Sequence, residues 1–318
     1  MTTPNPAFRP LVRRYGTAAI AEAAALIRAG HPVAVPTETV YGLAADATRG
    51  ESVAGIYAAK GRPAFNPLIV HVPDLAAAEH LAWFDDAARA LAAAFWPGPL
   101  TLVLPLRDRA GIAALCTAGL QTVAIRVPAH PAMRALLQAT GLPLAAPSAN
   151  ASGGISPTRA RHVAASLHGR IPLVIDGGAT ALGLESTIIA TGNPLRLLRP
   201  GPVTRAMIAA VTALPLVEGT GDRIEAPGQL ASHYAPAKPI RLNATAAHPD
   251  EWLIGFGPVP GDATLSAAGD LVEAAARLFD LLHAADTATP GWIAVAPIPA
   301  DGLGFAINDR LARAAAPR

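Results

Sequence analysis

The residues best suited to chemistry in this sequence are polar and charged side chains that follow predicted helices and strands. Lys60 and Arg62 lie two residues apart in a Gly/Pro turn, between a predicted helix (51–60) and an apolar strand (68–72). Arginine offers a planar fork for phosphate or carboxylate, and lysine a compact point charge. Of the 25 lysines and arginines only two are lysines, which favours a chemical role for this turn. A solvated helix end explains the turn equally well when it is considered alone.

A second candidate group is the loop after the predicted strand 143–150. The loop combines hydroxyl and amide side chains with two glycines that let the backbone approach a ligand; its members are Ser148, Asn150, Ser152, Gly153, Gly154 and Ser156. The same composition is typical of an ordinary surface turn. The apolar strand that leads in favours a site, because open α/β sheets bind ligands at the carboxyl ends of their strands.

Two polar residues interrupt strands that are otherwise apolar, Arg126 in VAIRV and His71 in LIVHV. A buried charge must be paired or functional. Arg126 therefore has an internal ion pair or a ligand carboxylate as its partner, and we favour the ligand. A lone histidine in a strand is more often a satisfied core residue.

Other candidates follow the short strand predicted at 32–36 or begin a later strand. The first set is Thr37, Glu38, Thr39 and Tyr41, at the carboxyl end where α/β sheets place ligands. The second set is Glu185, Ser186 and Thr187, for which a cap or turn is the alternative role.

The elements that must position these residues alternate between helix and strand. Helices are predicted at 17–30, 51–60, 74–82, 85–94, 130–141 and 203–214, with short ones around Cys116 and at Arg161 and His162. Asp85 is the expected cap of the fourth, and Pro157 the expected first position of the helix with Arg161. In the segment 95–106 a rigid turn leads into a predicted strand, and further strands are predicted at 121–128, 172–178, 184–191 and 195–201. This alternation predicts an α/β fold.

Length and composition predict two domains and a folded protein. The chain has 318 residues, 52% of them hydrophobic and 15% charged. We expect a large domain at 1–214, a linker at 215–238 that is rich in Pro and Gly, and a small α/β domain at 239–318 with helices near 269–284 and from 304. A linker of this length is usually functional or interdomain.

Several classes of function are disfavoured by the sequence. The chain has no long uncharged apolar run and no signal-peptide pattern, so we expect a cytoplasmic protein without membrane contact. The single cysteine, Cys116, reads as buried packing, and no metal motif or Walker A motif is present. A net charge of +2 does not indicate tight sequence-independent binding of nucleic acid.

Seven segments taken together resemble the YrdC-like family: PTETVYGL, YAAKGRPAFNPLIVHV, FWPGPLTLVL, VAIRVP, PSANASGGISPT, LESTI and LRPG. The linker APGQLASHYAP and the extra C-terminal domain are similar to the long form of the family. The resemblance implies a twisted open mixed sheet with helices packed on it, plus a small Rossmann-like α/β domain.

The resemblance also implies an enzyme, a nucleotidyltransferase. Its substrates would be ATP, L-threonine and bicarbonate or CO2, and its products threonylcarbamoyl-AMP and pyrophosphate, with Mg2+ as cofactor held mainly by the ATP phosphates and with no protein ligand. The product would pass to a downstream transferase that modifies the adenosine beside the tRNA anticodon. Direct binding of tRNA is not indicated by the charge of the chain.

Site residues carry over from the family by motif position. The threonine side would be Thr39, His71, Arg126, Ala146 and Ser186. The ATP side would be Arg62, Asn66, Thr122, Ser148, Ser156, Arg199 and Tyr234, and the catalytic set Lys60, Arg62, Ser148 and Asn150. Arg126 would bind the amino-acid carboxylate. Lys60 and Arg62 would stabilise phosphate charge, since such transfers need positioning and neutralisation more than a protein nucleophile.

The linker departs from the family because the lead-in to His233 and Tyr234 is less basic. We expect this segment to fold over the pocket as a lid that orders with ATP. Two other functions stay open. One is an RNA-binding YrdC-like module without catalysis, and the other is carbamoyl transfer in hydrogenase maturation, which the cysteine content and length of the chain oppose.

Overall fold

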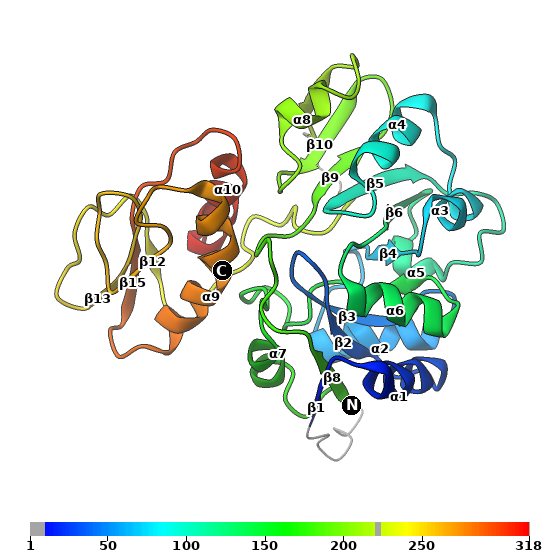
Figure 1. The fold of residues 1–318 in the computed structure, drawn as a ribbon, viewed down its shortest axis with the longest axis horizontal. Coiled ribbons are helices and arrows are strands. Elements are labelled where there is room, and N and C mark those ends of the chain that lie inside the picture. The colour runs from blue at the N-terminus through cyan, green and yellow to red at the C-terminus, as the bar shows by residue number, and fades with distance from the viewer. Residues whose placement is uncertain (1–9, 220–223, 318) are drawn as a thin grey trace.

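The computed structural model describes residues 10–219 and 224–317, so part of the predicted linker (220–223) lies outside the described residues. Within these ranges the strands form one sheet of eleven and one of four (Figure 1). We call the eleven-stranded sheet with its helices α1 to α8 the large domain. The four-stranded sheet with helices α9 and α10 is the small domain.

The large sheet mixes parallel and antiparallel pairs. For example, β1 pairs with β8 in parallel and β2 with β3 in antiparallel fashion. The predicted mixed open sheet is therefore confirmed. In sheet order its strands are β1 (Leu11–Arg14), β8 (Leu173–Asp176), β2 (Val33–Pro36), β3 (Tyr41–Asp46), β7 (Leu144–Ala145), β4 (Ile69–His71), β6 (Thr122–Arg126), β5 (Leu100–Pro105), β9 (Thr187–Ala190), β10 (Leu195–Arg199) and β11 (Leu216–Glu218).

Helices cover both faces of this sheet, because its buried strands are apolar on both sides. In β2, Val33 and Val35 pack on one face and Ala34 on the other. The first face is covered by α1 (Thr17–Arg28) and α6 (Pro131–Thr140). The opposite face is covered by α2 (Gly50–Lys60), α3 (Leu75–Leu81), α4 (Asp86–Phe95), α5 (Ala114–Thr117) and α7 (Ala160–Ser166).

Helix ends follow the sequence at two of the predicted positions. Gly61 ends α2 in the left-handed conformation, with φ of 60°. The carboxylate of Asp85 accepts a hydrogen bond from the backbone N–H of Ala88 at 2.7 Å and caps α4. The turn with Lys60 and Arg62 is thus placed by an ordinary glycine cap.

Two predicted helices are present but shorter than predicted. Pro157 lies outside the helix with Arg161 and His162: its carbonyl accepts the N–H of Tyr41 in β3 at 2.8 Å, and α7 begins only at Ala160. The helix predicted at 203–214 is reduced to α8 (Arg205–Ala209). Pro215 disfavours helical geometry in the residue before it, and a Thr212 turn replaces the helix.

The predicted linker contributes a strand to the large sheet. β11 pairs in parallel with β10, with Leu216 opposite Leu195. A strand of three residues is too short to show a periodic pattern in the sequence. Residues 216–218 therefore extend the large sheet at its edge, and the proposed start of the linker at 215 remains a prediction.

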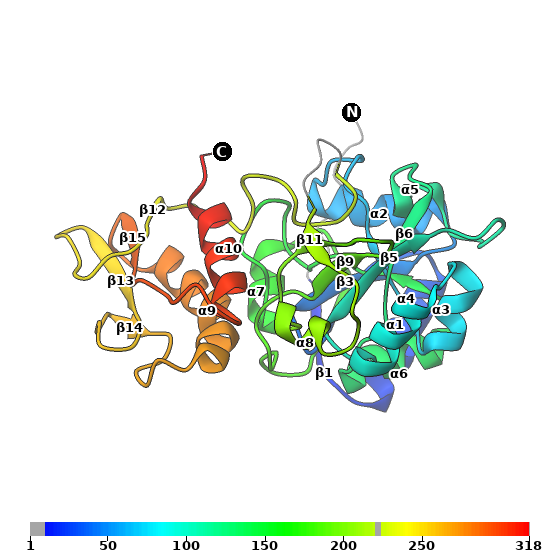
Figure 2. The ribbon, with the colours of Figure 1, turned by 90° about the horizontal axis from the view of Figure 1, so that it is seen from above.

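The small domain is a parallel sheet with two helices on the side facing the large domain (Figures 1 and 2). Its strands are β12 (Ile240–Arg241), β15 (Trp292–Val295), β13 (Glu251–Gly255) and β14 (Ala263–Thr264), and its helices are α9 (Leu271–Thr287) and α10 (Gly304–Ala315). The predicted small α/β unit is confirmed. Its core is continuous with Val40, Ile155 and Leu184 of the large domain and with Tyr234 of the linker.

None of the helices in the described parts of the chain is both long enough and apolar enough to cross a membrane.

Candidate active site

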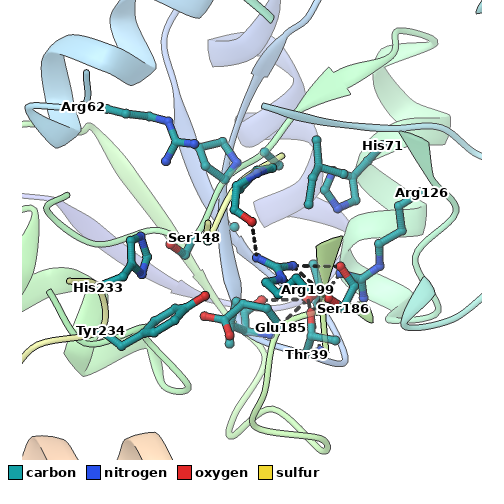
Figure 3. A pocket seen from close by; sticks show the side chains of 18 residues that line it. Thr39, Arg62, His71, Arg126, Ser148, Glu185, Ser186, Arg199, His233 and Tyr234 are labelled. Carbon is teal, nitrogen blue, oxygen red and sulfur yellow. Dashed lines mark hydrogen bonds between the residues drawn. The ribbon is translucent and has the colours of Figure 1, made fainter. Parts of the chain in front are cut away.

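A pocket lies where the middle strands of the large sheet end and the linker crosses over them (Figure 3). His71 and Arg126 are paired in the parallel register of β4 and β6, and each is the last residue of its strand. Both therefore lie at the carboxyl ends of neighbouring strands. The segment after β2 brings Thr37 and Thr39, and the polar loop after β7 brings Ser148. Polar groups from separate strand ends therefore meet, as the sequence predicts.

Arg126 forms one wall of the pocket and is only 3% exposed. Its Nη2 donates to the Oε1 of Glu38 at 2.6 Å, its Nη1 to the Oγ1 of Thr39 at 3.0 Å and its Nε to the carbonyl of Gly98 at 3.1 Å. Of the two partners weighed from the sequence, the internal ion pair is thus present. The role of Arg126 toward a ligand stays a prediction.

Glu38 holds Arg126 from behind. Burial alone would raise the pKa of Glu38, but the charge and hydrogen bond of Arg126 outweigh burial and lower this pKa. The second carboxylate oxygen accepts the backbone N–H of Ala129 at 3.1 Å. The arginine is therefore fixed in orientation, with its position set before any ligand arrives.

His71 and Ser186 complete the predicted threonine side together with Ala146, and all three line the pocket. Burial lowers the pKa of His71 to about 3, with the Arg126 charge acting in the same direction, so the ring is neutral at physiological pH. Its Nδ1 is buried and has no hydrogen-bond partner among the described residues. A buried nitrogen without a partner is typical of a group that a ligand satisfies.

Arg62 reaches the pocket from the turn after α2. Its Nη2 donates to the Oδ1 of Asn66 at 2.6 Å and to the carbonyl of Pro67 at 2.9 Å. Burial lowers the pKa of Arg62 to about 10. Asn66 is not itself in the pocket wall; in this structure it holds Arg62.

Lys60, unlike Arg62, is not part of the pocket wall. Its Nζ donates to the carbonyls of Ser148 and Asn150, each at 2.6 Å, and the side chain is 2% exposed. Burial lowers the pKa of Lys60 well below its ordinary value. Lys60 therefore lies behind the polar loop and supports it. Asn150 likewise faces its own loop, where its Nδ2 donates to the carbonyl of Gly154 at 2.8 Å.

Arg199 comes from the end of β10, and oxygens of Ser186 and Pro227 accept hydrogen bonds from its guanidinium. Its Nη2 donates to the carbonyl of Ser186 at 2.9 Å and to the Oγ of Ser186 at 3.1 Å. Gly228 in the linker has a φ of +88°, and a Cβ there would lie 2.8 Å from the Cδ of Arg199. Glycine at this position thus allows the linker to press onto the arginine.

The linker fills much of the pocket. Pro227, Gly228, His233 and Tyr234 all line it, and the rings of His233 and Tyr234 meet edge to face at 4.1 Å (Figure 3). The cavity that remains measures about 40 Å³. That is room for about three water molecules, and the linker residues form part of its wall.

Glu185 and Arg310 form an ion pair next to the pocket. The sequence indicates Glu185 only as a candidate with a cap or turn as its alternative role, and Arg310 was not predicted. Glu185 lines the pocket and accepts hydrogen bonds from the Oγ of Ser156 and, at 2.8 Å, from the Nε of Arg310. Burial alone would raise the pKa of Glu185, but the Arg310 and Arg199 charges outweigh it and lower the pKa. The available signal for Arg310 was a charge on the apolar stripe of α10, between Ile307 and Leu311.

Two further expectations concern Thr122 and the metal. Thr122 begins β6 and is not part of the pocket wall, so its role rests on the family resemblance. Among the described residues no group of three or more His, Cys, Asp or Glu side chains could hold a metal ion. Glu185, the acidic residue of the pocket wall, already binds Ser156 and Arg310. Mg2+ usually binds one or two carboxylates together with substrate phosphates, and the carboxylate of Glu185 is held here by donors of the protein.

Family comparisons agree with this two-domain architecture. Residues 25–201 match the Sua5/YciO/YrdC family model, which is described as telomere recombination. Residues 203–316 match the model described as the C-terminal domain of threonylcarbamoyl-AMP synthase. The fold and the pocket thus define an α/β protein with a Sua5/YciO/YrdC domain followed by this second domain.

Similar proteins narrow the class. A threonylcarbamoyl-AMP synthase of Bacillus subtilis is 42% identical over 94% of this chain and 93% of its own length. One of Pyrococcus abyssi is 40% identical over 92% of each. The crystal structure of P. abyssi Sua5 complexed with L-threonine superposes with a TM-score of 0.87 at 37% identity, covering 96% of this chain and 97% of that one. This chain belongs to the threonylcarbamoyl-AMP synthase family.

Proposed function

We propose that the pocket beneath the linker is the site at which this chain condenses L-threonine, bicarbonate or CO2, and ATP into threonylcarbamoyl-AMP, releasing pyrophosphate. The observation that carries the proposal is the convergence of Arg62, Arg126 and Arg199, all buried, on one pocket. Arg62 and Arg199 form no salt bridge with any described residue. Buried guanidinium groups without a carboxylate partner favour an anionic ligand.

The two substrates would lie on opposite sides of this pocket. Threonine would bind at Thr39, His71, Arg126, Ala146 and Ser186, with its carboxylate on the Nη1 face of Arg126. ATP would bind at Arg62, Ser148, Arg199 and Tyr234, with Asn66 holding Arg62. Ser156 is buried behind Glu185 and outside the pocket wall, so Ser156 and Thr122 are carried by the family motif. The P. abyssi structure is a complex with L-threonine, which supports threonine as a substrate of this chain.

The chemistry needs positioning more than a protein nucleophile. The threonine amine would add to CO2, lose a proton and give a carbamate. A carbamate oxygen would then attack the α-phosphorus of ATP while the bond to pyrophosphate breaks. Arg62 and Arg199 would neutralise the phosphates, and Lys60 would act through the carbonyls of Ser148 and Asn150 by fixing that loop.

The cofactor and partners follow from this reaction. Mg2+ would arrive with ATP, held mainly by its phosphates. The product would pass to a tRNA threonylcarbamoyl transferase in the cytoplasm. Direct tRNA binding is not part of the proposal, since the net charge of the chain is only +2.

The test is pyrophosphate release from ATP in the presence of bicarbonate and each amino acid in turn. We expect pyrophosphate release that depends on threonine and is lost in Arg199→Gln. The control is Arg107→Gln, which should retain release, because the Arg107 side chain lies over the ring of Trp83 and is not part of the pocket wall. Release that does not depend on threonine would overturn the proposal. Salt-dependent RNA binding without turnover would favour the RNA-binding alternative.

A further inference from the structure

Arg310 is a fully buried arginine of the small domain that contacts the pocket of the large domain. It lies on α10, has 0% exposure and is the largest side chain that is buried to this degree. Its Nε donates to the Oε2 of Glu185 at 2.8 Å, and its Nη2 to the carbonyl of Pro200 at 2.9 Å. Its guanidinium also lies over the Tyr234 ring, 5.2 Å from the centroid.

Each of these contacts adjoins a group on the nucleotide side of the pocket. Glu185 accepts the hydrogen bond of the Ser156 hydroxyl. Pro200 follows Arg199 in the chain, and Tyr234 belongs to the linker that lines the pocket. One side chain from the small domain therefore touches three separate parts of the site.

Docking of the two domains does not depend on Arg310 alone. Elsewhere between the two domains, the two carboxylate oxygens of Asp280 on α9 share the Nε–H of Arg159, each at 3.0 Å. The Oδ1 of Asp280 also accepts a hydrogen bond from the Nη2 of Arg161 at 2.7 Å. The shared apolar core adds Val40, Ile155 and Leu184. A buried charge is costly and is a weak source of stability. These facts favour a role for Arg310 in the site over a role as a domain clasp.

We infer that Arg310 is a positioning residue for ATP: it fixes Glu185, Glu185 fixes the Ser156 hydroxyl, and the small domain thereby completes the nucleotide side of the pocket. The inference rests on the proposed function for its substrate. Its geometric content, that Arg310 orders the loop with Ser156, holds independently of the reaction.

The experiment compares three variants of the full-length protein. Arg310→Met removes the contact with Glu185, and Arg310→Lys keeps the charge but loses the planar fork. The matched control is Arg241→Met, which breaks a two-bond pair with Glu251 inside the same small domain but away from the pocket. Steady-state kinetics gives the KM for ATP and the KM for threonine. Hydrogen–deuterium exchange of the amides in 153–158 and 184–187 is measured without substrate.

We expect Arg310→Met to raise the KM for ATP about tenfold, the effect of losing one charged hydrogen bond, and to leave the KM for threonine nearly unchanged. Exchange in both segments should accelerate, Arg310→Lys should restore part of each effect, and the control should show neither. Equal rises in both KM values, or exchange that matches the control, would overturn the inference. If wild-type protein gives no threonine-dependent release, the proposed function fails, and the exchange result still decides the role of Arg310.

Discussion

Among single residues, Arg126 is both paired inside the protein and part of the pocket wall. Its Nη2 is bound to Glu38, which fixes the orientation, and its Nη1 lies toward Thr39 and the pocket. A guanidinium has enough donors to do both, whereas an ammonium lacks the fork geometry. Arg126 can therefore be buried and paired and still be ready to bind a carboxylate.

This geometry predicts that Arg126→Ala raises the threonine requirement far more than the ATP requirement. The KM for threonine should rise tenfold or more, since a hydrogen bond to a charged group contributes about 1.5–3 kcal/mol. Steady-state kinetics with each substrate varied in turn measures this. Glu38→Gln removes the ion pair but keeps the arginine, so it should raise the KM for threonine less than Arg126→Ala does. Equal effects of Arg126→Ala on both KM values would show that the assignment is wrong.

Residues of this kind can be predicted from the sequence because they interrupt the apolar pattern of a strand. Arg126 and His71 interrupt apolar strands, and both prove to be buried at the pocket. Lys60 and Glu185 are harder, since the direction of a side chain in a turn is set by contacts that are distant in sequence. The Nζ of Lys60 meets carbonyls 88 and 90 residues away, and Glu185 meets Arg310 125 residues away. No local spacing contains that information.

At the scale of elements, the linker is the part that decides access to the pocket. Pro227 and Gly228 lie against Arg199, while the backbone N–H of Ala235 donates to the carbonyl of Gly153 at 2.8 Å. We propose that these residues form a lid which must shift to admit ATP. The supporting observation is the cavity of only about 40 Å³ beneath them.

Gly228→Ala is predicted to weaken the closed position of this lid. A Cβ at 228 would lie 2.8 Å from the Cδ of Arg199 and 2.9 Å from the Oη of Tyr234, at a φ of +88°. The cost is about 1 kcal/mol or more, so limited proteolysis within 215–238 should accelerate, and ATP should alter the cleavage of wild-type protein.

The matched control is Gly257→Ala, which has a φ of +55° but no neighbouring atom within 4 Å of the added Cβ. It carries backbone strain without a clash at the pocket. Wild-type cleavage in the linker that is the same with and without ATP would count against the lid. So would Gly228→Ala protein that is cleaved no faster than the control.

Most elements could be predicted from apolar periodicity and from glycine, proline and aspartate signals, as α2 and α4 illustrate. Those missed were decided by tertiary contacts. Pro157 lies outside α7, and its carbonyl accepts a hydrogen bond from the N–H of Tyr41 in β3. β11 forms by pairing with β10 at the edge of the sheet, with Leu216 opposite Leu195. A strand of three residues is too short for its apolar pattern to predict it.

At the scale of the whole molecule, the two domains meet along a seam that joins α7 to α9. The rings of His162 and His283 stack at 3.9 Å, and the Nε2 of His283 lies 3.2 Å from the carbonyl of Ser156. Asp280 receives Arg159 and Arg161 beside them. The small domain therefore adjoins the loop that carries Ser156 from two directions, through α9 and through Arg310.

Asp280→Asn is predicted to loosen this seam. The change removes the charge that two arginines share, which costs about 1 kcal/mol for a partly exposed group of ion pairs. Small-angle X-ray scattering should give a larger radius of gyration than wild type, most clearly at low salt. Glu273→Gln on the same helix is the control, since its pair with Arg277 is local to α9. An equal change in both variants would contradict a role of Asp280 in docking.

Lys60 has a consequence for anyone who redesigns this protein. Its small cationic tip ties the end of α2 to two carbonyls of the loop 148–150, in a space that is almost closed to solvent. A guanidinium is larger and flat, and cannot take that place without pushing the loop aside. A library that exchanges lysine for arginine to gain thermal stability should therefore leave position 60 untouched, although arginine is this chain's usual cation.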